Sequence, residues 1–260
     1  MKSLLMTSFF FLIITSKAQS FTMNNSARLA FGQDEVMVNV ASGFCQNLGI
    51  SDATLLSLVG NAVDKFWNKA PTSRLKLRQG SLINVANAFK TDSVCVASTN
   101  CTPNTTLQVS SDILISCNTN NSNFPTTAIL GVTIPNNISG GTIIGSLIVL
   151  NDNSGTLLAQ KNNDEITSII AHEIGHAIGL GHSPVEDSLM YFATRDKRKS
   201  LGRDDIDGVT YLYPKKEPIS ACGSIDLGEK SPPNWWGTLL IGFALVSLLE
   251  MSRKKIKTYI

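Results

Sequence analysis

Apolar and polar residues alternate along several short segments of the chain. In each of them an aliphatic side chain occupies every second position, or the segment is a short apolar run bounded by turn residues, as expected for strands buried on one or both faces. The last two segments are separated by a glycine-rich turn, Ser139-Gly140-Gly141. The pattern therefore predicts five strands, over residues 36–40, 75–77, 113–115, 128–134 and 146–150.

Two other segments follow the helical period. From Ser51 to Asn68, apolar residues recur every three or four positions, with Ser51 as the N-terminal cap and Pro71 as the stop. A second helix is expected from Asp164, where acidic residues in the first turn favour the positive end of the helix dipole. The segment 91–127 is rich in Ser, Thr and Asn and is expected to be irregular around one strand. Strands that alternate with helices predict an α/β (α+β) fold.

The N-terminal residues 1–18 have the pattern of a secretory signal peptide. Lys2 precedes an apolar run from Leu4 to Ile14, and the small residues Ser16 and Ala18 stand at the two positions that signal peptidase reads. The alternative is a transmembrane helix, but the run is shorter than the roughly 20 residues that a bilayer needs. We therefore expect export, with the body of the protein outside the cell.

The C-terminal end predicts attachment to a membrane. A linker is expected over 215–234, a transmembrane segment over 235–249 and a basic cytoplasmic tail over 250–260. Cys222-Gly223, a spacer with two prolines, the apolar run and the basic cluster occur in an order that resembles the sorting tails of some bacterial surface proteins. This likeness suggests a bacterial source. The sequence is compatible both with an anchor that is retained and with a sorting signal that is removed by cleavage.

Charge and composition exclude two classes of protein. Charged residues make up 16% of the chain, against about 25% in an average soluble domain, so a charge-rich disordered chain is excluded. Residues 1–18 contain two lysines, and residues 250–260 contain four basic residues and one glutamate, so the body between them has a net charge of −3. We therefore expect no nucleic-acid partner.

The cysteines fit an oxidising compartment. Four of them lie in the body and could form two disulfides in three connectivities, with Cys95–Cys101 the favoured short loop. Buried free thiols are the alternative. The fifth, Cys222, stands alone near the predicted membrane segment. The four in the body are Cys45, Cys95, Cys101 and Cys117.

All three histidines of the chain fall within the eleven residues HEIGHAIGLGH. His172 and His176 are four residues apart on the expected helix, so their imidazoles project from one face. Gly179 can adopt a left-handed conformation and turn the chain, which would bring His182 to the same point. Three nitrogen ligands leave a fourth position for water, as in catalytic zinc sites, and Glu173 is the candidate general base.

This motif resembles the signature of the metzincin metallopeptidases, and within that clan the chain is most similar to the matrixins. Ser188-Leu189-Met190-Tyr191 stands where the family has its Met-turn, and Leu201 to Pro214 resembles the closing helix of matrixin catalytic domains. The resemblance covers residues 31–214. It implies a twisted mixed sheet of about five strands, an active-site helix below it and a small C-terminal subdomain.

The resemblance also assigns supporting roles. Met190 would be the apolar floor under the zinc, although an ordinary core methionine explains it equally. Asp204 or Asp205 would bond the backbone beneath the Met-turn, the alternative being a solvated first helical turn. Zn²⁺ is the implied cofactor, and Ca²⁺ is a second that the family allows. The sequence departs from the family in having no cysteine-switch motif and no histidines for a second, structural zinc.

The sequence therefore predicts a zinc endopeptidase that acts on protein or peptide substrates of the extracellular space or envelope. It is expected to be a monomer that is exported and held at the cell surface or membrane. The substrate strand is expected to lie antiparallel to an edge strand, for which Ile143–Leu150 is the candidate. The rival hypothesis is a non-catalytic adhesion module with a zinc-bound helix as scaffold, and the presence of Glu173 argues against it.

Overall fold

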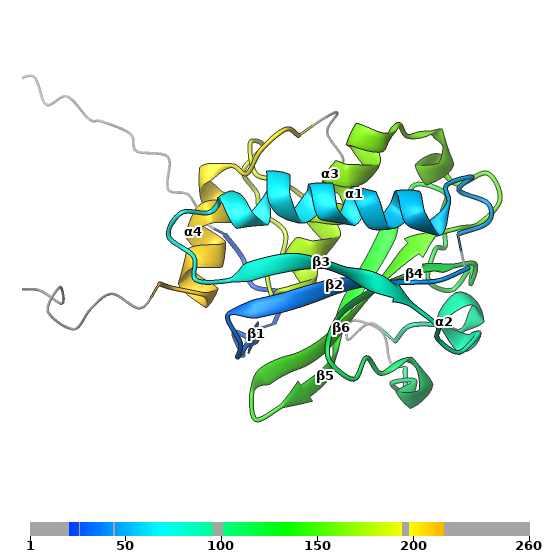
Figure 1. Cartoon of the computed structure of the whole chain (residues 1–260), viewed down its shortest axis with the longest axis horizontal. Coiled ribbons are helices and arrows are strands. Elements are labelled where there is room, and N and C mark those ends of the chain that lie inside the picture. Colours follow the sequence, from blue (N-terminus) through cyan, green and yellow to red (C-terminus); the bar gives the residue numbers. More distant parts are fainter. Residues whose placement is uncertain (1–20, 26, 44, 96–100, 194–197, 216–260) are drawn as a thin grey trace, which may run out of the picture. The chain divides into compact units, whose positions relative to one another are not determined.

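The computed structural model describes residues 21–25, 27–43, 45–95, 101–193 and 198–215 (Figure 1). The predicted signal peptide, membrane segment and basic tail lie outside these residues, as do Cys222 and all of the predicted linker except Lys215. Within the described ranges, no helix has the length and the apolar composition that crossing a bilayer requires.

A six-stranded mixed sheet forms the centre of the fold. The strands run in the order β3-β2-β4-β6-β5, and the short β1 pairs with the beginning of β6. All neighbours are parallel except β5 and β6, which form an antiparallel hairpin. The predicted mixed α/β architecture is confirmed. The strands are β1 (Ala30–Phe31), β2 (Glu35–Ala41), β3 (Lys76–Ile83), β4 (Asp112–Asn118), β5 (Gly131–Ser139) and β6 (Thr142–Asn151).

The prediction that Ile143–Leu150 is an edge strand is wrong. These residues belong to β6, which pairs with β4 on one side and with β5 on the other. The turn at Gly140 and Gly141, where φ is +56° and +78°, folds β5 back onto β6 and makes β5 the outer strand. Among the described strands, β5 is therefore the antiparallel strand with an unpaired edge.

Helices α1 and α3 pack on one face of the sheet and against each other (Figure 1). Ser51 caps α1 as expected, its hydroxyl accepting from the Thr54 N–H, but α1 ends at Lys65 and a 3-10 turn (Trp67–Lys69) completes the segment. The short α2 was not predicted. The helices are α1 (Asp52–Lys65), α2 (Ala88–Thr91), α3 (Asn163–Ala177) and α4 (Arg203–Leu212), with further 3-10 turns at Thr105–Leu107 and Leu157–Gln160.

Alternation along the strands divides the core into two clusters. On β4, Ile113 and Ile115 face α1 and α3, whereas Leu114 faces the opposite side. The second cluster is covered by α2 and by the segment that the sequence predicted to be irregular, through Phe89 and Phe124 among others. Both faces of the central strands are thus buried, which explains their continuous apolar runs.

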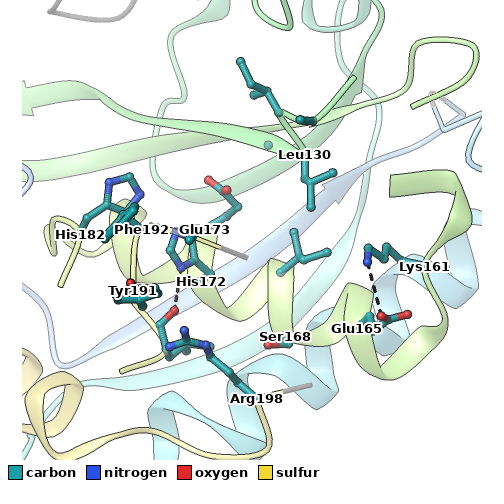
Figure 2. Close-up of a pocket in the computed structure, with 16 residues that line it drawn as sticks. Leu130, Lys161, Glu165, Ser168, His172, Glu173, His182, Tyr191, Phe192 and Arg198 are labelled. Carbon is teal, nitrogen blue, oxygen red and sulfur yellow. Dashed lines mark hydrogen bonds and ion pairs between the residues drawn. The ribbon is translucent and has the colours of Figure 1, made fainter. Parts of the chain in front are cut away.

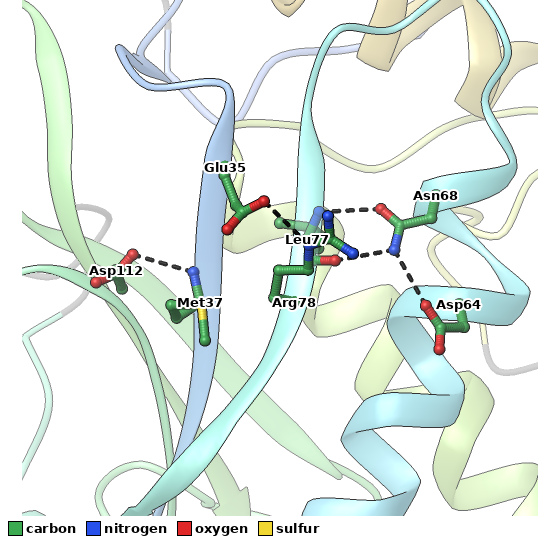
Figure 3. A network of polar contacts seen from close by, with 7 residues as sticks. All are labelled: Glu35, Met37, Asp64, Asn68, Leu77, Arg78 and Asp112. Atoms are coloured by element: carbon green, nitrogen blue, oxygen red, sulfur yellow. Dashed lines mark hydrogen bonds and ion pairs between the residues drawn. The ribbon is translucent and has the colours of Figure 1, made fainter.

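Side chains fix the outer strands of the sheet (Figure 3). The Asn68 amide donates to the Leu77 carbonyl and its oxygen accepts from the Leu77 N–H, both at 2.9 Å, so it replaces a neighbouring strand at this point of β3. Met37 donates its N–H to Asp112, and Arg78 donates to Glu35. These bonds hold β2 and β3 in register with the rest of the sheet.

Two disulfides connect the body cysteines. Cys95 bonds to Cys101, as predicted, and Cys45 bonds to Cys117 across 72 residues. The Cys45–Cys117 bond joins the end of β4 to the turn that precedes α1. Next to it, the buried carboxylate of Asp152 accepts the N–H groups of Gln46, Asn47 and Leu48, which fixes the same turn.

Candidate metal centre

Helix α3 presents the first two histidines. It begins with a complete capping box, in which Asn162 accepts the Glu165 N–H and Glu165 accepts the Asn162 N–H. Along the helix, the Trp67 indole donates to the carbonyl of Ala171 at 2.7 Å and Ser146 donates to that of Ala177 at 2.8 Å. Contacts from distant elements therefore fix both the position and the rotation of α3.

The chain turns sharply after α3. Gly179 has φ +108°, and a Cβ at this position would lie 2.2 Å from the Leu29 carbonyl oxygen, so only glycine fits. The buried hydroxyl of Tyr213 donates to the carbonyl of Ile178 at 2.7 Å. The turn brings His182 back beside the helix.

Three imidazoles converge as a result. The ligand nitrogen atoms of His172, His176 and His182 lie within 4.8 Å of one another, and Nε2 of His176 is 3.2 Å from Nε2 of His182. Two nitrogens bound tetrahedrally to one zinc ion would be about 3.3 Å apart. Among the described residues, no other set of three His, Cys, Asp or Glu side chains is close enough to hold a metal ion.

Backbone carbonyls orient two of the rings. Nδ1 of His172 lies 2.8 Å from the carbonyl oxygen of Leu189, and Nδ1 of His176 lies 2.8 Å from that of Leu180. A carbonyl accepts, so each Nδ1 carries the proton and each Nε2 offers a lone pair. Burial lowers the pKa of His176 to about 3, and it also lowers the pKa of His182. Imidazoles that converge with their Nε2 atoms inward fit a zinc ion.

The N-terminal residues 21–25 pack against the loop that carries the third histidine, a contact that the sequence did not predict. The hydroxyl of Thr22 donates to the His182 carbonyl at 2.5 Å, and the backbone carbonyl of Thr22 accepts the Gly181 N–H at 2.8 Å. The N–H of Asn24 bonds the Gly179 carbonyl at 2.9 Å. This pairing holds the loop, and Phe21 of the same segment packs against Tyr211 of α4.

The tight turn at residues 188–191 lies beneath the histidines. Met190 is buried, and its sulfur would lie 2.3 Å from a Cβ at position 175, so Gly175 provides the space that Met190 fills. Its carbonyl accepts the Ser183 N–H at 2.7 Å. The ring of Tyr191 contacts Phe192 and lines a pocket next to His172.

The two aspartates of α4 have different partners. The Asp205 carboxylate accepts the N–H of Leu189 at 2.6 Å and that of Met190 at 3.0 Å, and it also bonds the Ser188 hydroxyl. Asp204 instead accepts the hydroxyl of Ser183 at 2.5 Å. The resemblance implied that either Asp204 or Asp205 bonds the backbone beneath this turn. In the structure, Asp205 makes these bonds. Both side chains are buried and not solvated.

Glu173 lies beside the ring of His172 at the mouth of the pocket (Figure 2). Its side chain is 7% exposed, and burial raises the pKa of its carboxyl. The electrostatic interaction with His172 and a hydrogen bond from Thr133 oppose this rise. A buried carboxyl with a raised pKa next to three ligand nitrogens is suited to accept a proton from water.

The pocket has a volume of about 290 Å³ and extends from the histidines along α3. Its walls include Leu130 and Ile169, and the ion pair of Lys161 with Glu165 lies at the end away from His182 (Figure 2). The strand β5 and the segment before it form one wall.

Comparison with known proteins agrees with this site. The model of the Matrixin family matches residues 64–214, more than half of the chain, with the histidines, Glu173 and Met190 inside the match. The chain belongs to the matrixin family. The metzincin resemblance is thereby confirmed for this matrixin.

Individual relatives match this chain over shorter segments. It is 53% identical over 72 residues to "Metalloendoproteinase 2-MMP" of Arabidopsis thaliana, covering 27% of this chain and 17% of that protein. It is 45% identical over 68 residues to "Stromelysin-2" of Rattus norvegicus (25% and 14%) and 48% identical over 54 residues to "Matrix metalloproteinase-19" of Homo sapiens (20% and 10%). The matches span less than a fifth of each relative's length. These relatives are eukaryotic, so a bacterial source is not supported.

Removing the Asp205 carboxylate should unfold the turn beneath the histidines. We expect Asp205→Ala to lower the free energy of unfolding by about 3 kcal/mol, because the N–H groups of Leu189 and Met190 lose their buried acceptor. Asp207→Ala, which removes a half-exposed carboxylate from the same helix, should change it by less than about 0.5 kcal/mol. Denaturant titration of both variants measures the difference, and equal stability would show that Asp205 does not hold the turn.

Proposed function

We propose that this matrixin is a zinc-dependent endopeptidase. The observation that carries the proposal is the convergence of three imidazoles beside the buried carboxyl of Glu173, in a pocket lined by the start of β5, a strand that pairs only with β6 among the described strands. His172, His176 and His182 would hold the metal. A zinc ion bound there would lower the pKa of a water ligand and polarise the scissile carbonyl.

The protein groups supply the proton transfers. Glu173 would accept a proton from the attacking water as the oxygen bonds to the carbonyl carbon. It would then pass that proton to the amide nitrogen as the carbon–nitrogen bond breaks, so the carboxylate is regenerated. Met190 and Asp205 act on the reaction indirectly, by fixing the turn beneath the ligands.

Substrate would bind as an extended chain against β5. This strand is antiparallel to β6 and has one edge free of described partners, so a peptide can add to it through backbone hydrogen bonds. The pocket between Leu130 and Ile169 would receive one substrate side chain. Proteins or peptides are the proposed partners, and a monomer suffices because described residues of one chain build the site. Calcium is a further cofactor that the family resemblance allows.

The rival function, a non-catalytic adhesion module, gives Glu173 no role. A structural metal site does not need a buried carboxyl beside the ligands, and in such sites a fourth side chain closes the coordination. Among the described residues, three ligands are grouped and Glu173 lies next to them. The endopeptidase is therefore the better explanation.

Replacing Glu173 with Gln separates binding from catalysis. The histidine ligands stay in place, so we expect the zinc content to persist while turnover of a peptide substrate falls at least about a hundredfold, because the proton acceptor is lost. Glu35→Gln, which changes an exposed glutamate on β2, is the matched control and should retain wild-type activity. Full activity of Glu173→Gln would contradict the mechanism.

We further propose that the protein is exported and held at the membrane with the catalytic domain outside. The signal-like residues 1–18, the apolar segment 235–249 and the basic residues 250–260 support this, and two disulfides in the described body fit an oxidising compartment. Residues 235–249 would measure about 22 Å as a helix, less than the roughly 30 Å of a hydrocarbon core, so flanking residues would have to assist.

Intact-mass analysis of the native protein distinguishes the two forms of attachment. A mass that includes Ile260 indicates a retained anchor, and a mass that ends near Cys222 indicates a processed sorting signal. Deleting residues 231–260 should release active enzyme to the medium, because the apolar segment is gone. Full-length, uncut protein free in the medium would overturn the membrane proposal.

A further inference from the structure

The carboxylate of Glu173 has a specific partner on the strand that faces it. The hydroxyl of Thr133 donates to Oε2 of Glu173 at 2.5 Å. Glu173 is almost completely buried, so a charged carboxylate there needs a donor from the protein itself. The bond joins two elements that are 40 residues apart, β5 and α3, and it is not part of the metal-binding motif.

A second feature of β5 shows how closely the strand passes the carboxylate. Gly131 lies on the same face of β5 as Thr133, two residues earlier. A Cβ at position 131 would lie 2.9 Å from Cδ of Glu173 and 3.0 Å from Oε1. The carboxyl group therefore occupies the volume that a side chain at position 131 would fill, and it lies between this glycine and the Thr133 hydroxyl.

The register of β5 is fixed independently of Glu173. Val132 and Ile134, on the opposite face of the strand, pack into the second apolar cluster with Leu147 and Val149 of β6. A slip of one residue would turn these side chains out of the cluster. The packing of β5 therefore fixes the position of the Thr133 hydroxyl along the strand relative to Glu173.

We propose that Thr133 is a positioning residue that holds the general base in register with the substrate-binding edge of β5. The inference rests on the proposed function. The hydroxyl bonds Oε2, so we assign the proton of the attacking water to Oε1, which has no donor among the described contacts. A substrate strand added to β5 and the carboxylate held by Thr133 take their positions from the same strand, so docking aligns the scissile bond with the base.

Thr133→Val removes the hydroxyl and keeps the shape of the side chain. We expect kcat to fall at least about tenfold, while KM changes less than about twofold and the zinc content is unchanged, because one charge-assisted bond to the base is lost. Thr133→Ser, which restores the donor, should return kcat to within about threefold of wild type. Thr167→Val is the matched control, since that buried hydroxyl bonds the Asn163 carbonyl on the same helix as Glu173 and should leave kcat unchanged.

A double-variant comparison tests whether Thr133 acts through Glu173. In a Glu173→Gln background, Thr133→Val should change the residual rate less than about twofold, since the base is already absent. Should the valine variant not fold, Thr133→Ala lacks the same hydroxyl and replaces it in both measurements.

Three results overturn the inference in distinguishable ways. Wild-type kcat in the Thr133→Val variant shows that the bond does not position the base. An equal loss in the Glu173→Gln background shows that Thr133 acts on the structure and not through Glu173. If the wild-type protein itself cleaves no peptide in the presence of zinc, the proposed function fails, and this inference fails with it.

Discussion

The convergence of three imidazoles at one point is the constraint on which the site depends. Rings with their Nε2 atoms turned inward require α3 to be fixed in rotation and the chain to reverse at Gly179. They also require the carbonyls of Leu180 and Leu189 to accept the Nδ1 protons. Trp67 holds α3, and Asp205 holds the turn that supplies the Leu189 carbonyl. The 3-10 turn that carries Trp67 and helix α4 thus both act on the geometry of the site.

Much of this site could be predicted because its ligands are local in the sequence. The three histidines and Glu173 fall within eleven residues, and helical spacing together with one glycine determines their approximate positions. The alternating pattern likewise located five of the six strands, although the prediction ended six residues before the end of β3 and five before the end of β5. Periodicity reports which face a residue occupies, and that is sufficient for these elements.

What could not be predicted depends on which elements become neighbours. Periodicity does not encode strand order, so β6 was expected at the edge of the sheet although the hairpin places β5 there. For the same reason the bond from Thr133 to Glu173 and the pairing of Thr22 with the loop of His182 left no signal in the pattern. These contacts arise from long-range packing, and they determine how the base and the third ligand are held.

The most direct test of this account is the zinc content of the purified chain after dialysis against a weak chelator. The account predicts one zinc ion per chain, its loss in a His176→Ala variant and peptide cleavage that disappears when a strong chelator removes the metal. A chain that retains no zinc, or that cleaves peptides equally well without it, would contradict the assignment of the three histidines. Two zinc ions per chain would show that carboxylates or thiolates form a second site.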